Sequence, residues 1–432
     1  MTRACAFVTA NTFEFDSRHR RAADALAEDG WAVVVVAMAA PHLPAEEILA
    51  SGVVIRRPPV ERRLLLALPR ALREPAGRLL GLEAGAERLP PPGGGPVERI
   101  RRPLRRGLEV LAYRRRVGPW AAAVTAAAPS ARVFVAKALV ALPVVATAAR
   151  RSGAVYVYDI ADLHVDSGRL DGLPAPIKAV LRAREARWLR GAAALLAVTP
   201  AMADEVARRY GVARPTVVMN ARERWHPGEP LPRPTRLRTP AGVAIPKDRD
   251  VVLYQGAFRA DQGIDVLLRA LRHSPLADRP LAAVFIGFGP LEALLRAEAI
   301  DVPDRIVVRS AVPPDELLVW TGGADVAFVG TPPVTRNQTL TAPNKLFEAV
   351  MAGVPVVVAG GTWTASYVRE HALGAVVEPW TAGALGRTIA ELLDAPPAER
   401  DARRRRIRAI ALERLNWDTE RERLLATFRD LA

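Results

Sequence analysis

The feature that most constrains the fold is the alternation of short apolar runs with helical segments along the chain. The runs are rich in Val, Ile and Ala, and most are continuously apolar, as parallel strands covered on both faces are. The intervening segments supply the helical crossovers that parallel strands require. The predicted strands are residues 3–9, 31–38, 53–55, 132–136, 154–159, 194–198, 216–219, 251–255, 281–286, 305–308, 326–329, 354–358 and 375–377.

The chain of 432 residues is too long for one core and suits two domains of about 200 residues each. Residues 221–250 are rich in Pro and poor in periodic apolar residues, which indicates an interdomain connection. We therefore predict an α/β protein with two facing Rossmann-like, doubly wound domains, residues 1–220 and 251–432. The helices that end the second domain are candidates to cross back to the first.

Residues 60–118 interrupt the alternation and carry much of the positive charge. Residues 56–116 hold sixteen Arg, no Lys and six Glu, a surplus of ten in a chain whose formal charge is +15. One interpretation is a helical insertion that packs on its own domain with solvated arginines. The other is a basic amphipathic surface for anionic lipid or for a phosphorylated acceptor. Nucleic acid is not expected as a partner, because the region lacks interleaved aromatic residues.

The sequence predicts a cytoplasmic protein. Its one cysteine, Cys5, lies in an apolar run, so nothing points to an oxidising compartment. The N-terminus lacks the pattern of a signal peptide, and the longest apolar stretch, 133–149, is too short to span a bilayer. Contact with the inner membrane face through residues 60–118 stays open. Residues 162–166 contain two Asp and one His, but no second cluster completes a metal site, so no metal or other cofactor is expected.

Two loops of the second half leave a strand at a glycine and enter a helix, where free N–H groups favour phosphate. In the first, Gly256 ends the strand and Arg259 lies in the loop. In the second, Gly287 and Gly289 suggest a dinucleotide fingerprint, but Glu292 stands at the third glycine position and argues against it. Arg309, which follows the next strand, is a further candidate for phosphate or nucleotide binding.

The loop and helix in residues 325–361 are the most informative. Pro343 stands at the expected first turn of a helix, and Asn344 and Lys345 follow it. Glu348 lies one turn further along. Lys345, one of only four lysines, supplies a point charge for a phosphate, and Glu348 is suited to accept hydrogen bonds from ribose hydroxyls. The alternative is that both side chains are merely solvated.

The segment PNKLFEAVMAGVPVV resembles the donor-binding signature of the group 1 (family 4) glycosyltransferases, which have the GT-B fold of two facing Rossmann-like domains. The segments YQGAFRADQGIDVLLRAL and FIGFGPLEALL match the opening units of the family's second domain. In the first half, DSRHRRAADALAEDGWAVVVVA and VYDIADLHVDSGRL resemble the corresponding units less specifically. By this resemblance Glu348 is the second glutamate of the family's Glu-x7-Glu element and holds the nucleotide ribose.

This chain departs from the family pattern at four positions. The first glutamate of the element falls at Leu340, where backbone groups of Leu340 and Thr341 are the candidate substitutes. The family's Arg and Lys after the glycine fall at Ala257 and Gln262, which leaves Arg259 and Lys345 as the nearest cations for a diphosphate. The family's histidine near the donor sugar falls at Ala161. Two polar side chains follow shortly after it, Asp162 and His164.

The resemblance implies transfer of a sugar from a nucleotide-diphosphate sugar with retention of configuration and without a metal. The acceptor is either a small natural product with a hydroxyl or thiol, or a lipid-linked molecule. The expected catalytic residues are Arg259, Lys345, Asp162 and His164. The expected donor-binding residues are Gly256, Arg259, Gln262, Gly287, Arg309, Leu340, Thr341, Asn344, Lys345 and Glu348. The expected acceptor-binding residues are Asn11, Phe13, Asp16, Arg18 and Asp162.

Two rival functions remain at this stage. One is another GT-B enzyme, such as a nucleotide-sugar epimerase or a phosphorylase, although no feature of the sequence demands the extra acids or the pyridoxal lysine that these need. The other is a non-catalytic protein that binds nucleotide sugars or a membrane surface. The missing Arg, Lys and Glu of the family pattern make this second rival plausible.

Overall fold

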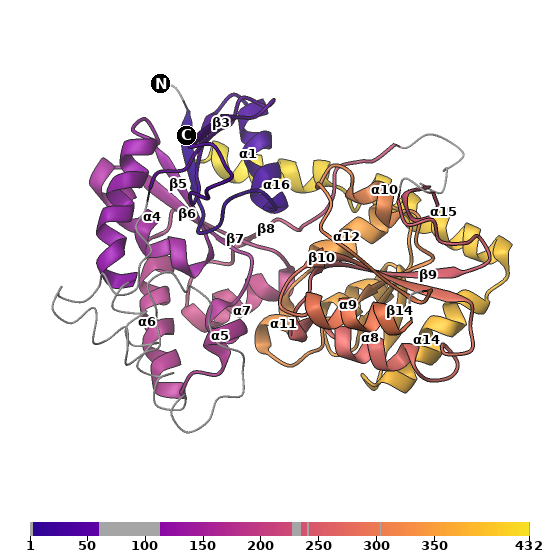
Figure 1. Cartoon of the computed structure of the whole chain (residues 1–432). Coiled ribbons are helices and arrows are strands. Elements are labelled where there is room, and N and C mark those ends of the chain that lie inside the picture. The colour runs from indigo at the N-terminus through magenta and orange to yellow at the C-terminus, as the bar shows by residue number, and fades with distance from the viewer. Residues whose placement is uncertain (1–2, 60–112, 227–234, 240–241, 303, 432) are drawn as a thin grey trace. The chain divides into compact units, whose positions relative to one another are not determined.

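The computed structural model describes residues 3–59, 113–226, 235–239, 242–302 and 304–431 (Figure 1). Contacts divide the chain into two compact units: Met1–Glu14, Ala23–Tyr158 and Gly191–Ala193 form the first, and Phe15–Ala22, Asp159–Arg190 and Ala194–Ala432 form the second. The domain bounds 1–220 and 251–432 stay predictions. Most of the expected insertion, residues 60–112, and residues 227–234 and 240–241 of the expected connection lie outside the described residues.

The first sheet has eight strands in the order β3-β4-β2-β1-β5-β6-β7-β8. In it β1 is parallel to both β2 and β5, as the continuously apolar runs predict. The strands are β1 (Ala4–Val8), β2 (Ala32–Val36), β3 (Glu46–Ile48), β4 (Val54–Arg56), β5 (Val133–Lys137), β6 (Val155–Ile160), β7 (Ala194–Ala197) and β8 (Thr216–Val217). The helices of this part are α1 (Ser17–Glu28), a helix over 113–127, α4 (Ala138–Ser152), the 3-10 turn η2 (His164–Asp166), α5 (Gly168–Asp171), α6 (Ala175–Gly191) and α7 (Pro200–Tyr210).

The second sheet has six strands in the order β11-β10-β9-β12-β13-β14, and all neighbouring strands in it are parallel. Its strands are β9 (Asp250–Ala257), β10 (Leu281–Phe288), β11 (Ile306–Arg309), β12 (Val326–Val329), β13 (Val356–Ala359) and β14 (Gly374–Val377). The helical elements are η3 (Thr235–Leu237), η4 (Ala260–Gln262), α8 (Ile264–Leu271), α9 (Glu292–Asp301), α10 (Leu317–Thr321), α11 (Arg336–Leu340), α12 (Asn344–Met351), α13 (Trp363–Glu370), α14 (Ala382–Asp394), α15 (Pro397–Glu413) and α16 (Trp417–Arg429).

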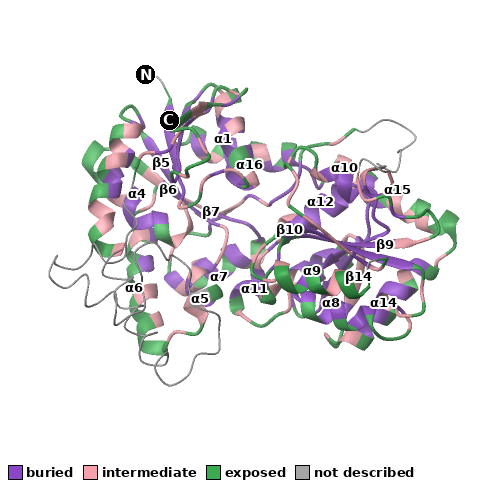
Figure 2. Ribbon diagram, in the orientation of Figure 1, coloured by how far each residue is buried: buried purple, intermediate pink, exposed green. Residues whose placement is uncertain are grey.

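Successive residues of β9 belong to two different hydrophobic cores. Val251 and Leu253 pack in the cluster that also contains residues of α12 and α15, whereas Val252 and Tyr254 pack in the cluster that contains residues of α8 and α14. Because neighbouring side chains of a strand point to opposite faces, the sheet is covered by helices on both sides. Figure 2 shows the resulting buried strands between partly exposed helices.

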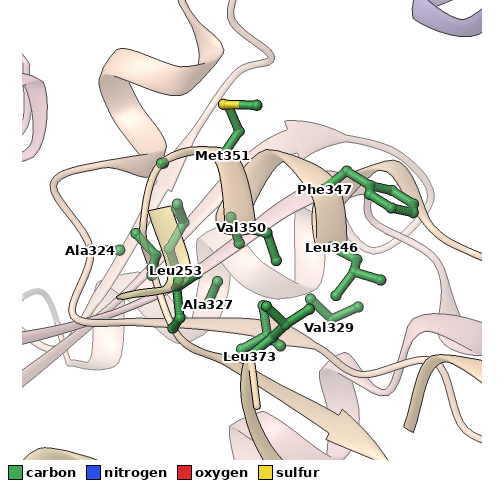
Figure 3. Packing of buried hydrophobic residues seen from close by; sticks show 14 of the residues in the cluster. Leu253, Ala324, Ala327, Val329, Leu346, Phe347, Val350, Met351 and Leu373 are labelled. Carbon is green, nitrogen blue, oxygen red and sulfur yellow. The ribbon is translucent and has the colours of Figure 1, made fainter. Parts of the chain in front are cut away.

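Helix α12 is anchored through one of these cores. Leu346, Phe347, Val350 and Met351 are buried beside Leu253, as Figure 3 shows. The helix begins at Asn344. The sequence analysis placed Pro343 in the first helical turn, but its backbone is extended, so Pro343 is the residue that precedes the helix. Gly353, at a φ of +69°, ends the helix where a terminating glycine was expected.

The sequence missed one strand, β3. Its three residues are Glu46, Glu47 and Ile48, and it pairs antiparallel with β4 at the edge of the first sheet. A short charged strand of this kind protects a sheet edge and lacks the apolar run by which the other strands are recognised. Within the described part of the chain, no helix combines the length and the apolar character needed to cross a membrane.

Candidate functional site

Two glycines lie side by side near the carboxyl ends of β9 and β10 and form what we call the glycine edge. Gly256 and Gly287 are register partners on these two strands. A methyl group on Gly287 would come within 1.9 Å of the Gly256 carbonyl oxygen, so no other residue fits there without movement. Both glycines also have a positive φ, of 124° and 156°. This close approach leaves the backbone of Gly256 exposed at the end of its strand.

Lys345 lies beside this glycine edge. Its side chain is buried, and its Nζ donates a hydrogen bond of 2.7 Å to Oε1 of Gln262. The same Nζ lies 4.3 Å from the ring centroid of Tyr254, which is a cation–π contact. A methyl group on Gly256 would lie 4.0 Å from Lys345 Cε. The ammonium group therefore sits next to the glycine edge, and no carboxylate among the described residues forms a hydrogen bond with it.

This environment lowers the affinity of Lys345 for its proton. Burial lowers the pKa of Lys345 to about 7, while Glu348 and Asp261 raise it and Arg259 lowers it further. Burial also raises the pKa of the Tyr254 hydroxyl, so the ring beneath the lysine stays neutral at ordinary pH. A lysine poised in this way gains most from an anion that enters beside it.

Glu348 lies one turn after Lys345 on the same helix. Its Oε2 accepts a hydrogen bond of 2.6 Å from Nε2 of Gln255, a buried residue of β9. The other end of the Gln255 amide, Oε1, lies 2.8 Å from the hydroxyl of Thr321 on α10. The carboxylate is thus held from one side, and a second oxygen remains for other donors.

The N-terminus of α12 adds backbone donors to the site. No side chain caps this helix. Its first N–H groups therefore lack the partners that a capping residue gives to a helix start. Asn344, the first residue, donates from Nδ2 to the hydroxyl of Ser17 at 3.2 Å. Lys345 and these N–H groups together concentrate positive potential at one end of the helix.

Arg259 is less available than the sequence suggested. Its guanidinium pairs with the carboxylate of Asp261, which also lies 3.4 Å from Nε2 of Gln262. Arg259 is exposed, so this pair can exchange with water or with a ligand. The same loop carries Arg259 and Gln262, and Gln262 is the residue that accepts a hydrogen bond from Lys345.

Leu340 and Thr341, at the position of the missing first glutamate, use their backbone groups within the protein. The Leu340 carbonyl accepts a hydrogen bond of 2.6 Å from the Thr199 hydroxyl. The Thr341 N–H donates to the carbonyl of Asn337 at 3.0 Å. Thr341 also lines a small recess together with Thr331, Gln338, Thr362 and Thr364. Hydroxyl and amide groups thus occupy the region where the family has an acid.

Asp162 and His164 lie just after β6. Asp162 accepts a hydrogen bond of 2.8 Å from Nδ2 of Asn337, whose Oδ1 accepts one of 2.7 Å from the Leu163 N–H. His164 begins the turn η2 and is half-buried. Asn337 therefore fixes the loop that carries both residues, and their catalytic roles stay predictions.

The four other residues predicted to bind acceptor lie in the loop before α1 and at the start of this helix. Asn11 and Phe13 belong to the first unit, where Phe13 is only 4% exposed. Asp16 and Arg18 belong to the second unit and are buried. Arg18 is held by Asp159 through two hydrogen bonds of 2.7 Å, and also by the Val218 carbonyl and Asn220. Phe13 and Arg18 are thus both buried, and the acceptor-binding role of all four residues stays a prediction.

Arg309 also has protein partners. It ends β11, donates to the Gly242 carbonyl at 3.0 Å and lies 5.0 Å from the ring centroid of Trp320. Within the described residues, no three His, Cys, Asp or Glu side chains gather closely enough to hold a metal ion. The structure thus brings Gly256, Gln262, Lys345 and Glu348 together and places Arg309 in contacts of its own.

Sequence reasoning missed Gln255, Tyr254 and Asp261. Gln255 is a polar residue at the end of the apolar run VVLY, and this is a signal that could have identified it. Tyr254 precedes it and reads as an ordinary core residue. Asp261 lies two residues from Arg259, but a pair so close in sequence is not informative until the loop conformation is known.

Residues 236–411 match the model of the family described as glycosyl transferases, group 1. D-inositol 3-phosphate glycosyltransferase 1 of Catenulispora acidiphila is 31% identical over 266 residues, which are 57% of this chain and 59% of that protein. D-inositol 3-phosphate glycosyltransferase of Streptomyces scabiei is 26% identical over 264 residues, which are 58% of this chain and 56% of that protein. The chain thus matches less than two thirds of the length of these curated relatives.

Solved structures agree with the two-sheet architecture along the whole chain. Sucrose-phosphate synthase from Thermosynechococcus elongatus aligns with a TM-score of 0.70 and 16% identity, over 99% of both chains. The Anabaena protein HepE in complex with UDP-glucose aligns with a TM-score of 0.64 and 15% identity, over 99% of this chain and 100% of that one. The chain therefore has the GT-B fold, and its segment 236–411, which carries the glycine edge, Lys345 and Glu348, matches the family model of the group 1 glycosyl transferases.

Proposed function

We propose that this protein transfers a glycosyl group from a nucleotide-diphosphate sugar to an acceptor. The observation that carries the proposal is the placement of Lys345 beside Gly256, with Glu348 one turn away on the same uncapped helix. A cation with backbone donors suits a diphosphate, and a carboxylate suits the two hydroxyls of a ribose. Both side chains lie in the segment that matches the family.

The catalytic task is to stabilise the nucleoside diphosphate as it leaves. Negative charge collects on its terminal phosphate while the bond to the sugar breaks, and fixed positive groups in a water-poor site lower the energy of that state. Lys345 and the N-terminus of α12 are the groups that we propose for this role, and the buried position of Lys345 beside Gln262 supports it. Arg259 becomes a second cation when the diphosphate competes with Asp261 for it.

The stereochemical course follows from the family resemblance. We expect retention of anomeric configuration without a metal, with the leaving phosphate helping to deprotonate the acceptor on the same face of the sugar. No separate side-chain base is then required. Asp162, held by Asn337, and His164 are the candidates for further contacts with donor or acceptor.

The acceptor is proposed in two classes, a small molecule with a hydroxyl or thiol, or a lipid-linked molecule. The curated relatives are named for D-inositol 3-phosphate, which belongs to the first class. The basic sequence of residues 60–118 favours the second, because anionic lipid attracts arginine-rich segments. Sedimentation with anionic liposomes, comparing the full chain with a deletion of residues 61–117, separates the two. Binding that the deletion abolishes supports a lipid-linked acceptor.

The test of the function itself is release of nucleoside diphosphate. The protein is incubated with UDP-, GDP- and dTDP-sugars, with and without D-inositol 3-phosphate or acceptor extracts, and calorimetry measures nucleotide binding in parallel. Lys345→Ala should weaken binding of the diphosphate, and Lys247→Ala, at an exposed lysine, is its matched control. Absence of binding to every nucleotide refutes the proposal, whereas binding without turnover indicates a non-catalytic binding protein.

A further inference from the structure

Two exposed aromatic side chains meet at the carboxyl end of the second sheet. Phe15 is 56% exposed and Phe288 is 52% exposed, and their ring centroids are 5.5 Å apart. Every other Phe, Tyr or Trp in the described ranges is buried or half-buried. Exposed aromatic surface costs free energy in water, so a pair kept at this position indicates a contact with something else.

The backbone holds Phe288 firmly in this exposed position. Its carbonyl accepts a hydrogen bond of 2.8 Å from the Phe258 N–H. The glycines on either side pack against the neighbouring strand, because a methyl group on Gly289 would lie 2.7 Å from the Phe258 carbonyl oxygen and one on Gly287 would overlap Gly256. The exposure of the ring is therefore a property of the folded strand end rather than of a loose loop.

The register of β9 and β10 places the pair relative to the proposed donor contacts. Gln255, which holds Glu348, is opposite Ile286, Gly256 is opposite Gly287, and Ala257 is opposite Phe288. Along the strands the order is therefore the carboxylate proposed for ribose, then the glycine edge proposed for diphosphate, then the aromatic pair. Successive residues along these strands are about 3.3 Å apart.

We infer that Phe15 and Phe288 form a binding surface for a flat apolar group of the acceptor, such as an aromatic ring beside the hydroxyl or thiol that is glycosylated. The inference rests on the function proposed above. A nucleobase is attached to the ribose and so belongs on the side of Glu348, away from the pair. The reacting sugar is attached to the other end of the diphosphate, and the acceptor must approach this sugar. Both therefore belong at the end where the aromatic rings lie.

This surface distinguishes acceptors by chemistry. An aromatic ring that stacks on the pair gains affinity by about 3- to 10-fold over a ligand without the ring. A fully polar acceptor, such as an inositol phosphate, gains little from two phenylalanine rings. The surface therefore favours a small aromatic acceptor within the classes proposed above.

The experiment compares matched ligands that differ only in the apolar group. Phenyl and methyl α-D-glucosides, and the corresponding α-D-galactosides, are titrated against the full chain in the presence of whichever of UDP, GDP or dTDP it binds. Saturation-transfer NMR and calorimetry measure the affinities. The variants are Phe288→Ala and Phe15→Ala, with Phe288→Tyr as the conservative replacement. Ile300→Ala, at an apolar side chain on α9 that is 78% exposed, is the control.

The expected result is tighter binding of the phenyl glycosides by about 3- to 10-fold, lost in both alanine variants and kept in Phe288→Tyr and Ile300→Ala. Equal affinity for phenyl and methyl ligands, including no detectable binding of either, overturns the inference. So does a loss of nucleotide affinity in Phe288→Ala, because the pair would then contact the base. Nucleotide binding is measured separately, so failure of this inference is distinct from failure of the proposed function.

Discussion

The charge state of Lys345 should make donor binding depend on pH. In the free protein burial lowers the pKa of Lys345 to about 7, so the group is half charged at neutral pH. A bound diphosphate stabilises the charged form and raises this pKa, so binding is strongest below pH 7 and weakens as the pH rises through 7. The neighbouring charged groups, Glu348, Asp261 and Arg259, act on the same equilibrium.

The magnitude follows from the charged fraction of the lysine. With a pKa of about 7 the charged fraction is about 90% at pH 6 and about 3% at pH 8.5, so affinity should fall about 30-fold if only the ammonium form binds. The ligand must not titrate over this range. A nucleotide sugar such as UDP-glucose meets this condition, whereas the terminal phosphate of UDP, with a pKa near 6, does not.

Calorimetry in buffers of different ionisation enthalpy provides the assay. At pH 7.5 the wild-type protein should take up about 0.8 proton per nucleotide sugar bound. Lys345→Arg, which stays charged throughout, should bind without this uptake and with a flatter pH profile. An affinity that is constant between pH 6 and 8.5, or the same profile in wild type and Lys345→Arg, would refute the reasoning.

Three further predictions concern the same region. Glu348→Ala should weaken nucleotide binding about 10- to 100-fold in calorimetry, since a hydrogen bond to a charged group is worth about 1.5–3 kcal/mol. Glu391→Ala, at an exposed glutamate, is the control and should leave nucleotide binding unchanged. Gln255→Leu leaves the Glu348 carboxylate without its buried donor and should lower stability by about 1–3 kcal/mol in urea unfolding; unchanged stability would contradict the contact. Gly287→Ala should destabilise the fold by about 2 kcal/mol or more, whereas Gly172→Ala, where a methyl group meets nothing within 4 Å, should be nearly neutral.

Much of the architecture could be predicted because its signal is local. Parallel strands buried on both faces are continuous apolar runs, so β1 and β9 were recognisable from their own residues. The edge strand β3 could not be recognised in this way, because two of its three residues are glutamates and its place depends on its partner β4. Residue Gly256 was expected to end its strand, but β9 continues to Ala257 because it pairs with the long strand β10.

The site was harder to predict, because partners distant in sequence decide which side chains are available. Lys345 and Glu348 were identified from their spacing on one helix, and the structure places both at the glycine edge. Arg18 was expected to bind acceptor, and Asp159, far away in the sequence, holds it in a buried ion pair. Although burial opposes it, Arg18 and His19 hold the pKa of Asp159 well below its usual range, so this carboxylate stays charged within the pair.

The single turn of α12 between Lys345 and Glu348 fixes the distance between these two groups. Three residues along an α-helix advance about 4.5 Å, and the buried side chains on the opposite face prevent the helix from sliding. Any ligand that uses both groups must present its anion and its hydroxyls at a separation set by this turn. Substitutions in the surrounding loops can therefore change what is attached at either end of the ligand, while the length of its middle part stays fixed by the backbone.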